Sequence, residues 1–139
     1  MFETGANAYR KTRVVTANQA QLVVQLYEGM VFFVGHAIGA LDEGNLETAH
    51  ASLKRAQEIV VTLRGTLRRD VGPLAQNLDA LYDYFYRRLV EANVRKDPSP
   101  AREVLDYARQ LLQTWQVVAM NATPGADKVE ERALSMARR

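Results

Sequence analysis

Apolar side chains recur at alternating steps of three and four residues through four segments of the chain. This spacing is typical of amphipathic helices, each of which buries one apolar stripe. The stripes predict four helices that need one another as packing partners. Their members are Leu22, Leu26, Met30, Phe33, Ala37 and Leu41; Leu46, Ala49, Leu53, Ala56, Val60, Leu63 and Leu67; Leu74, Leu78, Leu81, Phe85, Leu89 and Ala92; and Ala101, Val104, Ala108, Leu111, Trp115 and Val118.

Residues that interrupt helices separate the four segments. Glycine and proline place the breaks at residues 44–45, 72–73, 97–100 and 123–125. Pro73 and Pro100 suit a first helical turn, where no backbone donor is lost. Side chains that can accept from the first free amides predict the N-caps: Thr16 or Asn18, Asn45, and Ser99 for the first, second and fourth helices.

Short connections between long helices place consecutive helices antiparallel. We therefore expect an all-α protein, an antiparallel up-down-up-down four-helix bundle, over residues 18–122. No segment alternates apolar and polar residues as a strand would. Residues 1–17 have few large apolar groups and are expected to form a mobile N-terminal arm. Residues 123–139 are expected to be a C-terminal tail or a short helix through Val129, Ala133 and Met136.

Composition narrows the class of protein. A chain of 139 residues suits one domain, and its net charge of +2 is too small for a strongly basic nucleic-acid surface. The absence of cysteine excludes disulfides and thiolate sites. The longest apolar run, residues 30–34, is far shorter than a membrane span, and no signal-peptide pattern is seen in residues 1–20. We expect a cytoplasmic protein with no nucleic-acid partner and no stable membrane insertion.

One motif raises the possibility of a metal centre. Glu47 and His50 have the Glu-x-x-His spacing that holds di-iron sites in helical bundles. The chain has no second such motif, however, and a glutamate in the first turn of a helix is favoured by the helix dipole. A solvated helix start is the preferred interpretation, so we expect no metal ligands and no cofactor. A di-metal or other ligand-binding bundle remains the alternative.

No catalytic constellation is evident. Asp79 and Asp83 share one helical face, but Arg87 lies four residues beyond Asp83, and an ion pair explains that spacing. Glycine-rich phosphate loops and nucleophile motifs are missing. We therefore predict that the protein is not an enzyme and has no catalytic residues.

The helices carry more apolar residues than one stripe requires. Val24, Val31 and Ile38 form a second line on the first helix, at seven-residue intervals, and Leu105 and Leu112 add to the fourth. This surplus has two interpretations. The first is a wide core in which each helix touches two neighbours. The second is an exposed surface for the amphipathic segment of a partner.

Several strings, in order and spacing, resemble the flagellin export chaperones of the FliS type. The resemblance covers roughly residues 9–116. One departure follows Ala17, where the family usually has a small polar residue and then proline, and this chain has Asn18 and Gln19. The strings are Tyr9; Val14-Val15-Thr16-Ala17; Leu22-Val23-x-x-Leu26-Tyr27-Glu28-Gly29; Leu53-Lys54-Arg55-Ala56; Leu74-Ala75-Gln76-Asn77-Leu78-x-x-Leu81-Tyr82-Asp83-Tyr84; Arg88-Leu89-x-x-Ala92-Asn93; Asp97; Glu103-Val104; and Leu111-Leu112-x-x-Trp115.

The resemblance implies a function. Members are cytoplasmic helical bundles that bind the disordered C-terminal segment of flagellin, prevent its premature polymerisation and assist its delivery to a component of the flagellar type III export gate. It also implies that Tyr9 and Thr16, in the N-terminal arm, contact the client or the gate. The arm is then predicted to cover part of the client surface until flagellin displaces it. A generic helical adaptor for another bacterial partner is a further alternative.

These arguments combine into a predicted site and a predicted core. The core is predicted to include Leu26, Leu53, Leu81 and Trp115, and Asn77 is predicted to fix the start of the third helix or a contact within the bundle rather than to bind the client. The predicted partner-binding residues are Tyr9, Thr16, Val24, Tyr27, Val31, Ile38, Tyr82 and Tyr84.

Overall fold

The described part of the chain folds into four helices in succession. The computed structural model describes the backbone of residues 5–67 and 72–121, and the side chains of these residues from Gln19 onward, Leu74 excepted. No strand occurs within these ranges, which confirms the all-α prediction. The helices are α1 (Gly5–Asp42), α2 (Leu46–Gly65), α3 (Pro73–Arg95) and α4 (Pro98–Met120).

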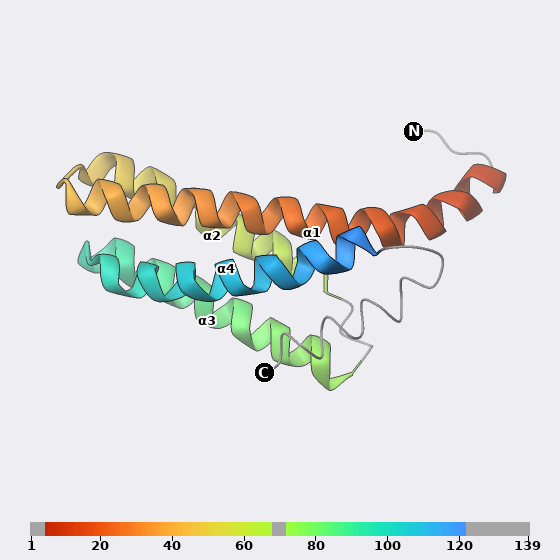
Figure 1. The fold of residues 1–139 in the computed structure, drawn as a ribbon. Coiled ribbons are helices and arrows are strands. Elements are labelled where there is room, and N and C mark those ends of the chain that lie inside the picture. The colour runs from red at the N-terminus through yellow and green to blue at the C-terminus, as the bar shows by residue number, and fades with distance from the viewer. Residues whose placement is uncertain (1–4, 68–71, 122–139) are drawn as a thin grey trace.

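Each helix runs antiparallel to the next, and α4 returns beside α1 to close the bundle (Figure 1). Arg102, at the start of α4, contacts Asp42, at the end of α1, with an N–O distance of 3.1 Å. Gln19, within the first half of α1, donates from Nε2 to the backbone oxygen of Thr66, just after α2. α1 packs extensively on both α2 and α4, whereas α3 has less contact with its own neighbours.

The predicted breaks between helices are confirmed where the structure describes them, and one predicted cap is wrong. Gly44 and Gly72 have positive φ angles, of 76° and 103°, which only glycine adopts without strain. Asn45 caps α2 by accepting from the Thr48 amide at 3.2 Å. α4 is capped by Asp97, which accepts from the Ser99 amide at 2.9 Å, rather than by Ser99.

The first helix begins earlier than its predicted caps. α1 starts at Gly5, so residues 5–17 of the predicted arm share a helical backbone with the bundle (Figure 1). The physical reason is the absence of a helix-breaking residue. No proline or glycine occurs between Ala6 and Gly29, and Asn18 and Gln19 do not force a break, so the helix can begin earlier. Residues 122–139, which include the predicted tail and the break at 123–125, lie outside the described residues.

The core lies along the bundle axis, and its members differ in part from the predicted stripes. The six predicted residues of α4 are all buried. On α1, however, Leu22 is 46% exposed and Leu26 and Phe33 are half-buried. Met30, Ala37 and Leu41 are buried as predicted, whereas the predicted Leu22, Leu26 and Phe33 are replaced by residues one position away. The buried residues of α1 are Ala20, Val23, Tyr27, Met30, Val34, Ala37, Ala40 and Leu41.

Part of α1 is apolar enough to raise the question of a membrane span. Gln19–Asp42 reaches a mean hydropathy of 1.4, which would suffice for a span by length and composition alone. One third of that stretch is buried inside the bundle, where it packs against α2 and α4. A core helix in contact with two neighbours accounts for this apolar composition.

Glycines inside α1 give a stability prediction. A Cβ added at Gly39 would have no atom within 4 Å, whereas one at Gly29 would lie 3.1 Å from Ile59 Cδ1. Alanine is favoured over glycine inside helices, so Gly39→Ala should raise the free energy of unfolding by about 0.5–1 kcal/mol. Urea denaturation followed by circular dichroism measures this gain. Gly29→Ala should gain less, because Ile59 must move; an equal gain in both variants would contradict the described packing.

Candidate functional site

The second apolar line of α1 lies where α1 meets α4. Val24, Val31 and Ile38 are half-buried and pack against the core. The contact of Arg102 with Asp42 aligns the antiparallel helices α1 and α4. It places residues of α4 at about the same heights along the bundle axis as the second apolar line of α1. We call the resulting strip the α1–α4 seam. It comprises Val24, Val31 and Ile38 of α1 and Leu105, Leu112 and Ala119 of α4.

The packing at the α1–α4 seam mainly favours the first interpretation of the surplus apolar residues, a wide core. Val24, Val31 and Ile38 pack against the core, as the wide-core interpretation requires. Their burial is incomplete: Leu105 is 8% exposed, and the other five seam residues are half-buried. The seam therefore leaves part of the surface of these apolar side chains accessible.

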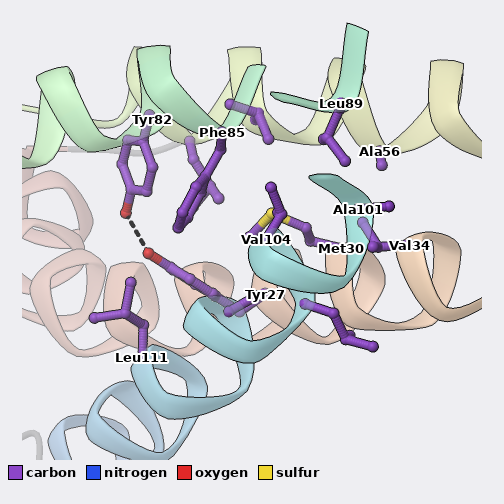
Figure 2. Close-up of a cluster of buried hydrophobic side chains, with 14 of the residues drawn as sticks. Tyr27, Met30, Val34, Ala56, Tyr82, Phe85, Leu89, Ala101, Val104 and Leu111 are labelled. Atoms are coloured by element: carbon purple, nitrogen blue, oxygen red, sulfur yellow. Dashed lines mark hydrogen bonds between the residues drawn. The ribbon is translucent and has the colours of Figure 1, made fainter. Parts of the chain in front are cut away.

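Two tyrosines predicted to bind a partner lie in the core instead of on the surface. Tyr27 is fully buried and Tyr82 is 1% exposed. Figure 2 shows their hydroxyl groups pointing toward one another across the bundle, and the two oxygens are 2.7 Å apart. Neither side chain offers surface to a partner in this structure. The reason is that each supplies the hydrogen-bond partner that lets the other be buried.

Burial controls the chemistry of this tyrosine pair. It raises the pKa of both hydroxyls well above the ordinary tyrosine value, so both stay protonated at neutral pH. The buried indole Nε1 of Trp115 lies near the Tyr27 hydroxyl, whose pKa it lowers slightly against the effect of burial, but it makes no well-aligned hydrogen bond within the described ranges. Tyr27, Tyr82 and Trp115 thus place polar atoms inside an otherwise apolar core, without a nucleophile or a general base beside them.

Tyr84, another predicted site residue, is half-buried and joins α3 to α4. Its hydroxyl donates to the carboxylate of Glu103, with 2.8 and 2.9 Å to the two oxygens. Arg88 Nε donates to the same carboxylate at 2.8 Å. The hydrogen bond from Tyr84, aided by Arg88, lowers the pKa of Glu103. These three residues, which we call the Glu103 clamp, form a polar link between the two helices.

The structure also exposes apolar residues that the sequence analysis did not single out. Phe32 is 62% exposed; its ring stacks on His36 and meets Phe33 edge-on at 5.1 Å. Tyr107, 44% exposed, packs on Phe85 from the outside of α4. The sequence could have indicated this exposure, because neither Phe32 nor Tyr107 lies on the first or the second apolar line of its helix.

Other predicted positions are accounted for as far as the structure describes them. Asp83 and Arg87 form the expected ion pair at 3.0 Å. Asn77 is exposed, near the start of α3. The side chains of Tyr9 and Thr16 lie outside the described residues, so their roles and the idea of a covering arm stay predictions.

Within the described ranges the metal alternative gains no support. There, no group of three or more histidine, aspartate or glutamate side chains could hold an ion. His50 Nδ1 lies 2.9 Å from Asn93 Nδ2 and so accepts a hydrogen bond from that amide, in line with a surface role.

Comparison with known proteins gives consistent matches. A family model described as "Flagellar protein FliS" matches residues 2–122. The flagellar secretion chaperone FliS of Bacillus subtilis (strain 168) is 35% identical over 109 residues, which cover 78% of this chain and 81% of that protein. The protein of the same name from Escherichia coli (strain K12) is 34% identical over 118 residues, covering 81% and 87%. Flagellar secretion chaperone FliSB of Pseudomonas aeruginosa is 31% identical over 110 residues, covering 78% and 87%.

Proposed function

Because this chain belongs to the FliS family of flagellar proteins, we propose that it is a cytoplasmic export chaperone for flagellin. The family consists of secretion chaperones, not enzymes, which confirms the resemblance noted in the sequence. In the proposed role, the protein binds the disordered C-terminal segment of flagellin and prevents its premature polymerisation. It then assists delivery to a component of the flagellar type III export gate. The observation that carries the proposal is the family match over nearly the whole chain.

The physical properties of the bundle support this role. Ordering a disordered segment costs conformational entropy, so a binding surface has to be apolar and preformed to compensate. The α1–α4 seam, the exposed Phe32 and the exposed Tyr107 lie on helices whose inner faces are tightly packed. Covering the apolar face of flagellin would remove the surface that otherwise nucleates filament assembly, and no covalent chemistry is needed.

The proposed client surface follows from these positions. Val24, Val31 and Ile38 are its centre, and Tyr84 contributes from α3. Tyr9 and Thr16 are retained as proposed contacts of the N-terminal residues. Tyr27 and Tyr82 are assigned an indirect role: they fix the positions of α1 and α3 from inside the bundle.

Isothermal titration calorimetry tests the proposal directly. The purified chain is titrated with a peptide that corresponds to roughly the last forty residues of flagellin from the same cell. We expect a one-to-one complex with a negative heat-capacity change, which marks the burial of apolar surface. The absence of binding to this peptide under conditions where the bundle is folded would contradict the proposed function.

A charged substitution in the α1–α4 seam tests whether the flagellin peptide binds there. Val31→Asp should weaken peptide binding about tenfold or more, while the midpoint of thermal unfolding changes little. Val94→Asp is the matched control, because Val94 is 77% exposed at the far end of α3 and should bind as the unmodified protein does. If Val31→Asp unfolds the protein, the position belongs to the core, and the proposed surface has to be moved.

A further inference from the structure

We infer that α3 is the helix that separates first from the bundle, leaving α1, α2 and α4 packed as one unit. The inference concerns the free chain and does not depend on the proposed client. It rests on three independent features: how the helices pack, which kind of bond attaches α3, and what lies beneath it.

Packing is uneven around the bundle. α1 contacts α2 and α4 along much of their length and forms the most extensive pairings in the structure. The contacts of α3 with α2 and with α4 are both less extensive, and that with α4 is the smallest of the four. In Figure 1 the first turns of α3 diverge from α4 and α1, so the packing loosens toward the start of α3.

Polar side chains compensate for this looser packing on the α2 side. Arg64 of α2 donates to both carboxylate oxygens of Asp79, at 3.0 and 3.1 Å, and to Asp83 at 3.3 Å. Near the opposite end of the same helix pair, Asn93 bonds to His50 at 2.9 Å. Side-chain polar contacts therefore connect α3 to α2 near both ends.

The α4 side is connected in the same way. The Glu103 clamp joins Tyr84 and Arg88 of α3 to α4 through one carboxylate. All four helices contribute apolar residues to the common core, among them Leu78, Phe85 and Leu89 of α3, so what distinguishes α3 is the smaller extent of its apolar packing. The polar contacts compensate for this only weakly, because ion pairs between partly exposed groups contribute little and are screened by salt.

The interior beneath α3 lowers the cost of its separation. The Tyr82 hydroxyl, on α3, bonds to Tyr27 of α1, and the buried Trp115 indole nitrogen of α4 lies near Tyr27 without a well-aligned hydrogen bond in the described part of the chain. Water that enters when α3 moves away can hydrogen-bond all three groups. Two further polar side chains are buried in the described part of the chain, Ser52 and Gln57, and both belong to α2.

Native-state hydrogen exchange of the full, unliganded chain tests the inference. Amides in the middle of α3 are expected to exchange about tenfold faster than those in the middle of α1, through an opening that costs less free energy than global unfolding. Raising sodium chloride from low to high concentration should widen this difference. If the amides of all four helices exchange only together, or if α2 or α4 exchanges first, the inference is overturned.

Two isosteric variants test whether the polar contacts of α3 control its separation from the bundle. Glu103→Gln removes the charge of the Glu103 clamp and keeps a hydrogen-bond acceptor for Tyr84. It should raise the exchange rates of α3 severalfold and leave those of α1 unchanged. Asp42→Asn makes the same chemical change in the α1–α4 ion pair and should leave α3 unaffected. Equal acceleration of α3 by both variants would show that general destabilisation, not detachment of α3, causes the exchange.

Discussion

Replacing Phe85 with alanine should destabilise the protein by about 3–5 kcal/mol. Phe85 is fully buried on α3, and its ring packs on Tyr82 and Tyr107 at centroid distances of 6.3 and 6.0 Å. Figure 2 shows the ring beside Tyr82 within the cluster of buried side chains from α1, α3 and α4. Truncation therefore removes apolar contacts to several helices and leaves a cavity that the backbone cannot fill without moving.

Denaturant unfolding followed by circular dichroism measures this loss. Phe32→Ala is the matched control, since it removes the same ring from a position that is 62% exposed. Its effect on the free energy of unfolding should stay within about 0.5 kcal/mol. Losses of similar size in the two variants would contradict the described core.

Removing one hydroxyl from the buried tyrosine pair is the second large effect. Tyr27→Phe or Tyr82→Phe should each lower the free energy of unfolding by about 1–3 kcal/mol, because the remaining hydroxyl loses its partner inside the core. The 2.7 Å separation of the two oxygens means that each group satisfies the other. The double variant leaves no orphaned hydroxyl at either position, so it should cost less than the sum of the two single variants.

A double-mutant cycle on the same unfolding assay isolates this coupling. Tyr107→Phe serves as the control, because Tyr107 is 44% exposed and its hydroxyl can remain in contact with water. Strictly additive effects of Tyr27→Phe and Tyr82→Phe would show that the two hydroxyls do not depend on one another.

The helices could be predicted from the sequence because their stripes are long and periodic. α4 is the clearest example: the six residues of its predicted stripe are all buried, and its start is set by Pro98. The wrong choice of Ser99 over Asp97 as its cap has a local cause. Both residues can accept from an early amide, and only the backbone angles show that Asp97 precedes the first turn.

The displaced stripe of α1 has a tertiary cause. The three-and-four spacing of apolar residues predicts Leu26 for the core of α1 and places Tyr27 among the partner-binding residues. Tyr27 is nevertheless the buried residue, since Tyr82 comes from another helix to accept or donate its hydrogen bond. The same contact buries Tyr82 in α3 and leaves Leu81 half-buried. Sequence periodicity within one helix carries no information about a partner in another helix.

For the candidate site, the sequence predicts which apolar residues share one line of α1, but not how much of that line stays exposed. The seven-residue interval of Val24, Val31 and Ile38 correctly places them on one line of α1. How much of that line is covered depends on the register of α4, which only the folded bundle determines. Phe32 shows the converse: its position off both lines indicates exposure, which is a sequence signal that was not used.

The extensive pairing of α1 with α4 has a consequence for synthesis on the ribosome. These helices are the first and the last of the described part of the chain, so the most apolar helix is completed long before its largest partner exists. At translation rates of 5–20 residues per second, about 4–16 s separate the completion of α1 from that of α4. During that interval, only α2 and then α3 are present to cover the apolar face of the nascent α1, so aggregation is most probable before the last helix emerges.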